Sequence, residues 1–200
     1  MVFYFTDVLD ENTTDYLNDI LQLKLEDQPF DGDYMKEQNA RVSLQKSQTS
    51  RKIVNIVAPL FQKAGLTVNP DNGYIFYTSH FYNSTTHIDN RYSIDSEESE
   101  YWDNVNVCYI ITHKNPHLKG GNMTVYENYE YTSFLQLIGY EKKENKKETV
   151  ILNQGSVFIT KGNTYNKLNG CSGNGHFNYI KVVLYEKQRV GHRADNDDDE

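Results

Sequence analysis

The sequence places an imidazole and a carboxylate two residues apart, at His87 and Asp89, in the run Thr-His-Ile-Asp-Asn. On a β-strand, residues i and i+2 project from the same face, so both side chains can reach one cation. Imidazole and carboxylate donors together suit a divalent transition metal. The pair is therefore a candidate metal site. Its interpretation depends on the helices and strands that position it.

Other residues with reactive side chains have less support. His113 and His117 are four residues apart, but Lys-Asn-Pro between them is typical of a turn, so we expect loop histidines rather than a helical zinc pair. The two cysteines, Cys108 and Cys171, have no metal-ligand spacing. We interpret both as ordinary thiols.

Two helices are expected at the front of the chain, within residues 13–65. Thr13 or Thr14 is a possible cap for the first, because apolar residues follow at helical spacing. The second runs from about Ser50 to an end signal at Gly65, and Pro59 should kink it or begin its last segment.

After Gly65 the pattern changes to short apolar runs separated by polar turns, which is typical of a sandwich or barrel rather than of alternating strands and helices. Sixteen tyrosines and nine phenylalanines favour the same half-buried strands. We predict a mainly β fold with flanking helices. The expected strands are 74–81, 105–112, 123–126, 149–152, 156–160 and 177–185.

Composition limits the class of protein. With 200 residues, the chain is expected to form one domain over 1–190, followed by an acidic, disordered tail at 191–200. The net charge of −8 argues against a nucleic-acid partner, and the apolar stretches are too short for a membrane span. Neither a signal-peptide pattern nor a disulfide framework is evident, so we expect a cytoplasmic protein.

Several motifs occur in a recognisable order. Tyr77 lies ten residues before His87, a strand follows, the Gly120-Gly121 pair opens another strand, and a Gly-Ser-Val-Phe strand follows later. Over about residues 74–186 this order resembles the iron(II)/2-oxoglutarate dioxygenases of the prolyl-4-hydroxylase type. The resemblance implies a double-stranded β-helix, or jelly-roll, and a hydroxylase that acts on a peptidyl or small-molecule side chain.

The resemblance also implies roles for particular residues. His87 and Asp89 match two iron ligands, and Tyr77 matches the tyrosine that helps to hold the co-substrate carboxylate. At the third metal position this sequence has Asn166 instead of histidine. His176 or Lys181 would then meet the distal carboxylate of 2-oxoglutarate.

Other interpretations stay open at the level of the sequence. A shifted register makes His176 the third ligand, with Lys187 or Arg189 as the anion partner, and requires residues 163–175 to form one long loop. Because two family hallmarks are altered, the chain could instead be a non-catalytic binding or assembly module with the same fold. A cupin-like sugar or acid binder would share the fold without needing 2-oxoglutarate.

Overall fold

The computed structural model describes residues 2–5, 8–26, 37–43, 48–84, 91–92, 105–127, 146–161, 164 and 166–186. The predicted acidic tail at 191–200 lies outside these residues, as do His87 and Asp89. Neither described helix has the length and apolar character needed to cross a membrane.

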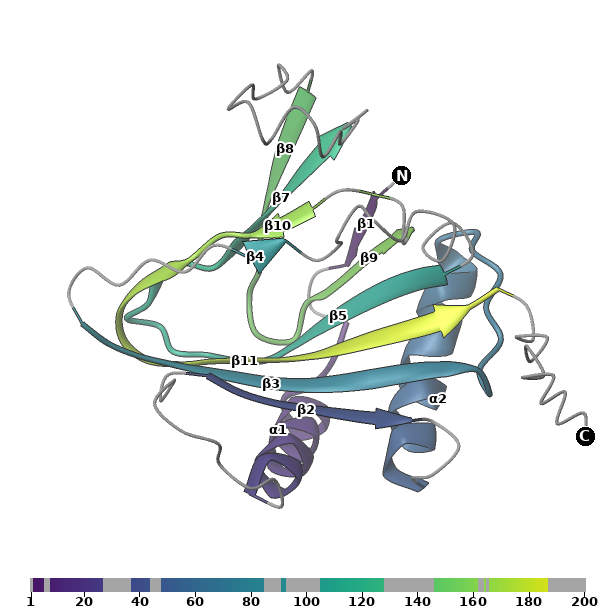
Figure 1. The fold of residues 1–200 in the computed structure, drawn as a ribbon, viewed down its shortest axis with the longest axis horizontal. Helices are drawn as coiled ribbons and strands as arrows, with labels where there is room; N and C mark the ends of the chain where they lie inside the picture. The colour runs from purple at the N-terminus through teal and green to yellow at the C-terminus, as the bar shows by residue number, and fades with distance from the viewer. Residues whose placement is uncertain are drawn as a thin grey trace, which may run out of the picture.

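Within the described residues, two helices and eleven strands follow one another along the chain (Figure 1). The helices are α1 (Glu11–Glu26) and α2 (Gln48–Lys63). The strands are β1 (Val2–Phe5), β2 (Glu37–Ser43), β3 (Gly73–Ser84), β4 (Arg91–Tyr92), β5 (Val105–Lys114), β6 (Lys119–Gly120), β7 (Asn122–Glu127), β8 (Lys146–Ile151), β9 (Val157–Lys161), β10 (Asn166–Leu168) and β11 (Cys171–Tyr185).

Both helices are confirmed, with differences at their ends. Asp10 caps α1, because its carboxylate accepts a hydrogen bond from the Thr13 backbone N–H at 2.7 Å, whereas Thr14 lies inside the helix. The helix α2 continues through Pro59. It ends at Lys63, and Gly65 follows with a φ of 68°, which lets the Leu66 N–H return to the Phe61 carbonyl at 3.0 Å.

The strands form two antiparallel sheets, and all six predicted strands are present. The large sheet has the order β1-β9-β5-β11-β3-β2, with β6 pairing beside β11, and the small sheet has the order β4-β10-β7-β8. From β3 to β11 the chain passes back and forth between the sheets, which is the jelly-roll pattern. The predicted fold class is confirmed.

The large sheet has two different faces (Figure 1). On one face, Ile75, Ile110 and Ile180 pack with α1 and α2 in a cluster that includes Leu17 and Phe61. We call this the helix-side face. The other face, which we call the inner face, packs against the small sheet. Because side chains alternate along a strand, neighbouring residues of β11 belong to opposite faces.

Candidate active site between the sheets

Lys181 is a cation on the inner face of β11. The strand register pairs it with Phe76 of β3 on one side and Tyr109 of β5 on the other. Its ammonium lies 5.7 Å from the Phe76 ring centroid and 5.6 Å from that of Tyr109. Part of the side-chain surface stays accessible, but burial lowers the pKa of Lys181 to about 8. An ammonium at this position can form an ion pair with an anion in the interior.

Asn166 belongs to the small sheet and lies on its inward side. It pairs with Val125 of β7, which is a member of the inner cluster, and residues opposite each other in a pair share a face. The side chain is 1% exposed. Its Nδ2 donates to the Thr164 carbonyl at 3.2 Å, but its Oδ1 has no hydrogen-bond partner within the described part of the chain. An amide oxygen left in this state costs free energy.

The structure does not bring Tyr77 to this inner face. Its side chain is fully buried in the helix-side cluster, on the opposite face of β3 from its neighbours Phe76 and Thr78. Burial raises the pKa of Tyr77, and the neighbouring Ser50 side chain of α2 partly offsets the rise. This placement argues against contact between Tyr77 and a co-substrate held by Lys181.

His176 also lies on the helix side. It is five residues before Lys181 on a strand that pairs with β3 without a register shift, so the two side chains point to opposite faces. Its ring packs against Phe81, and its Nδ1 is 3.4 Å from Ser79 Oγ. The alternative in which residues 163–175 form one loop is wrong, because β10 and the start of β11 lie within that range.

A metal ion fits the described half of the site through Asn166. An amide oxygen is a neutral donor, weaker for ferrous iron than imidazole, and a cation would satisfy the unpartnered Oδ1. Within the described residues, no three His, Cys, Asp or Glu side chains form a group that could hold a metal. A complete ligand set would therefore depend on His87 and Asp89.

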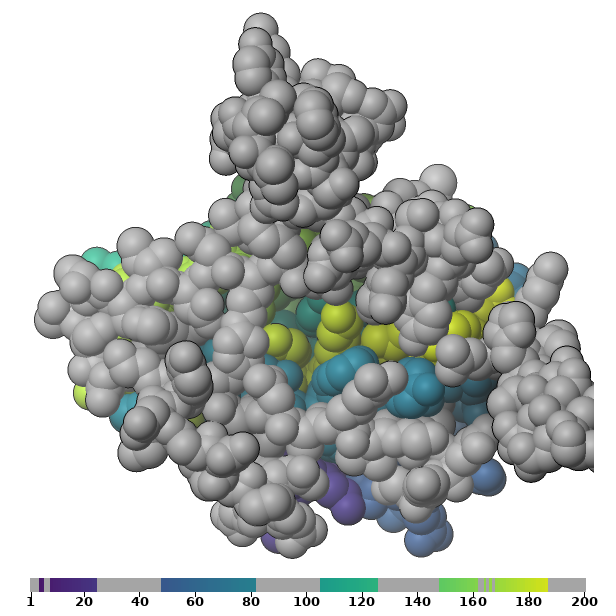
Figure 2. All heavy atoms as spheres, in the orientation of Figure 1, coloured from purple at the N-terminus to yellow at the C-terminus, as the bar shows by residue number. Residues whose placement is uncertain are grey.

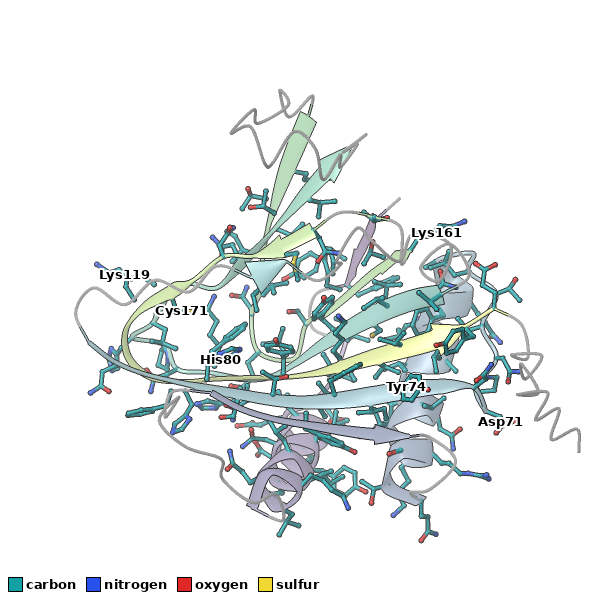
Figure 3. The ribbon with its side chains drawn as sticks, viewed as in Figure 1. Asp71, Tyr74, His80, Lys119, Lys161 and Cys171 are labelled. Carbon is teal, nitrogen blue, oxygen red and sulfur yellow. The ribbon has the colours of Figure 1, made fainter. Side chains whose placement is uncertain are left out.

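Several buried members of the inner cluster are aromatic, and sequence reasoning assigned none of them an individual role. Tyr74 and His80, labelled in Figure 3, lie towards opposite ends of β3, and the His80 ring stacks on Tyr179 at 5.8 Å. In the view of Figure 2, atoms of β3 and β11 are visible at the surface between the sheets. The aromatic residues that flank Lys181 are identified by the pairing register of β11 with β3 and β5. That register cannot be read from the sequence of a single strand.

A second lysine on this face is accommodated differently. Lys114 Nζ donates to the Leu152 carbonyl at 2.9 Å and lies 5.9 Å from the Phe177 ring centroid. Burial lowers the pKa of Lys114, and the negative charge that Cys171 carries in its thiolate form acts in the opposite direction. A backbone oxygen therefore binds the ammonium of Lys114.

Comparison with known proteins gives matches in structure. No protein-family model matches the sequence, and no curated protein matches it. The fold is similar to that of a prolyl-4-hydroxylase from Pseudomonas putida, with 7% identity, a TM-score of 0.57, and coverage of 93% of this chain and 92% of that one.

Two further structures extend the comparison. HygX from Streptomyces hygroscopicus, solved with nickel, 2-oxoglutarate and hygromycin B, matches with 7% identity and a TM-score of 0.62 over 94% of this chain and 83% of its own. A viral collagen prolyl hydroxylase from Paramecium Bursaria Chlorella virus-1 matches with 11% identity and a TM-score of 0.51 over 93% and 96%. The chain therefore has the fold of the 2-oxoglutarate- and iron(II)-dependent oxygenases.

Proposed function

We propose that the protein is an iron(II)- and 2-oxoglutarate-dependent oxygenase that hydroxylates a peptidyl or small-molecule side chain. The observation that carries the proposal is the position of Lys181 on the inner face, beside Phe76 and Tyr109, in the same interior as the unpartnered Oδ1 of Asn166. The Lys181 ammonium can bind an anion, and the Asn166 Oδ1 can bind a cation. A metal ion with a dicarboxylate co-substrate supplies both.

In this proposal Lys181 forms an ion pair with the distal carboxylate of 2-oxoglutarate. Phe76 and Tyr109 exclude water from that pair, which strengthens the attraction in a region of low dielectric constant. His87, Asp89 and Asn166 would hold the metal. When bound, the iron and 2-oxoglutarate supply the oxygen chemistry, in which the co-substrate is decarboxylated to succinate.

The relatives support the proposal through what they bind. HygX was solved with nickel and 2-oxoglutarate, and the nogalamycin epimerase SnoN with Fe³⁺ and α-ketoglutarate. Their bound molecules include hygromycin B and nogalamycin RO, whereas other similar structures are prolyl hydroxylases. Both small-molecule and peptidyl substrates are therefore compatible with this fold.

Production of succinate tests the proposal. Anaerobically purified protein is supplied with iron(II), 2-oxoglutarate and oxygen, and succinate is measured for wild type, Lys181→Met and Lys161→Met. Lys161 is exposed on β9 and serves as the matched control. We expect uncoupled succinate formation in wild type and in the control, and its loss in Lys181→Met. Absence of succinate in all three would favour the non-catalytic binding module.

A separate experiment tests Asn166 as the third metal ligand. Asn166→His places an imidazole where a weak oxygen donor stands, so iron(II) affinity and succinate formation should both rise. Because a new imidazole needs support for its other ring nitrogen, the gain could be less than a native histidine provides. Unchanged iron affinity in Asn166→His, with intact binding in His87→Ala, would contradict the assigned ligands.

A further inference from the structure

Two histidines come together on the helix-side face of the large sheet, away from the proposed active site. His113 of β5 is opposite Asn178 of β11, and His176 lies two residues before Asn178 on the same face. Diagonal neighbours of this kind are within reach of long side chains. Burial lowers the pKa of His176, and the positive charge of His113 lowers it further, which is consistent with two nearby rings.

A chain of hydrogen bonds orients the His176 ring. Asn178 Nδ2 donates to Asn18 Oδ1 of α1 at 2.9 Å, so Asn178 Oδ1 acts as an acceptor, and Ser79 Oγ donates to it at 2.6 Å. The single Ser79 proton is used in that bond. At the 3.4 Å contact, Ser79 therefore accepts from Nδ1 of His176, which leaves the lone pair of the neutral ring on Nε2.

This arrangement is the one that metal-binding histidines use. A ligating imidazole usually donates its other ring N–H to a neighbouring oxygen, which fixes the tautomer and the ring orientation. The Phe81 ring, with its centroid 4.7 Å from that of His176, restricts the ring further. Both histidines keep contact with solvent, so an ion can reach them and water can complete its coordination.

We propose that His113 and His176 form a surface site for a borderline divalent cation, best represented by Zn²⁺, with water as the remaining ligands. Imidazole nitrogens select zinc, nickel and copper over magnesium or calcium. His176 and Lys181 lie on opposite faces of β11, so this site is separate from the proposed oxygenase centre. The inference does not depend on the proposed function.

Calorimetric titration with zinc chloride at neutral pH tests the site. His176→Gln and His113→Gln should each weaken zinc binding at least about tenfold, since a site with two protein ligands loses half of them. His117→Gln is the matched control, because His117 is exposed on the neighbouring turn. Ser79→Ala removes the orienting oxygen and should weaken binding about tenfold.

Two further measurements distinguish zinc binding at His113 and His176 from zinc binding at the predicted iron ligands. His87→Ala removes a predicted iron ligand and should leave the zinc site intact, and zinc should shift the imidazole NMR signals of His113 and His176. Circular dichroism checks that each of these variants, including Ser79→Ala at a buried position, remains folded. Absence of zinc binding in wild type, or equal affinity in wild type, His113→Gln and His176→Gln, would overturn the proposal.

Discussion

Both faces of the large sheet bury apolar side chains, but the two faces differ in the polar groups that are buried with them. The helix-side face packs Leu17, Phe61 and Ile180 without exposure, and its buried asparagine, Asn178, is hydrogen-bonded on both sides. The inner face buries aromatic residues together with a desolvated lysine and an unpartnered amide oxygen. The first arrangement stabilises the fold, whereas the second costs stability and is suited to ligands.

The comparison predicts that large truncations on the helix side affect stability alone. Phe61→Ala should lower the free energy of unfolding by about 3–5 kcal/mol, because it removes a fully buried ring and leaves a cavity. Urea unfolding measures the loss, and 2-oxoglutarate affinity of the folded fraction should not change. Ile151→Ala, at a side chain that is 60% exposed, is the control with little expected effect.

On the inner face, a substitution should raise the free energy of unfolding instead of lowering it. Lys181→Met removes a desolvated charge from an aromatic setting and should raise the free energy of unfolding at pH 7 by up to about 3 kcal/mol. The folded-state pKa of about 8 lies below the ordinary 10.5, so the penalty is complete below pH 8 and is relieved as pH rises towards 10.5. Wild type should therefore approach the stability of Lys181→Met over that range.

Denaturant unfolding at pH 7, 8, 9 and 10 checks this prediction. The difference between Lys181→Met and wild type should shrink with increasing pH. A constant difference would mean that Lys181 is not desolvated in the folded protein.

Two asparagines with the same burial give the finest test of the comparison. Asn166 and Asn178 are each 1% exposed. Asn178→Leu should cost about 1–3 kcal/mol, because Ser79 and Asn18 lose their partner, whereas Asn166→Leu should change stability little. Thermal or urea unfolding of the two variants side by side measures the contrast, and equal losses would show that Asn166 Oδ1 has a partner in the folded protein.

The sequence predicted the long elements well because they contain continuous apolar or periodic runs. The strands β1, β2, β4, β6 and β10 were missed. β2 is mostly polar, and the other four contain four residues or fewer. Their pairing depends on neighbouring strands rather than on their own composition.

For the candidate site, the residue types were easier to predict than the directions of the side chains. Asn166 and Lys181 were selected and lie in the interior, whereas Tyr77 and His176 lie on the other face. The expected strand began at 177, so the alternation from His176 to Lys181 could not be followed. The side of Tyr77 depends on pairing Lys181 with Phe76, which is a property of the assembled sheet.

Binding of 2-oxoglutarate tests the central claim most directly. Anaerobic calorimetry with iron(II) should show binding to wild type and Lys161→Met, and its loss in Lys181→Met. Because the carboxylate should raise the pKa of Lys181, binding at pH 8–9 should take up part of a proton in wild type. Equal affinity in wild type and Lys181→Met, without proton uptake, would contradict the account of the inner face as a co-substrate site.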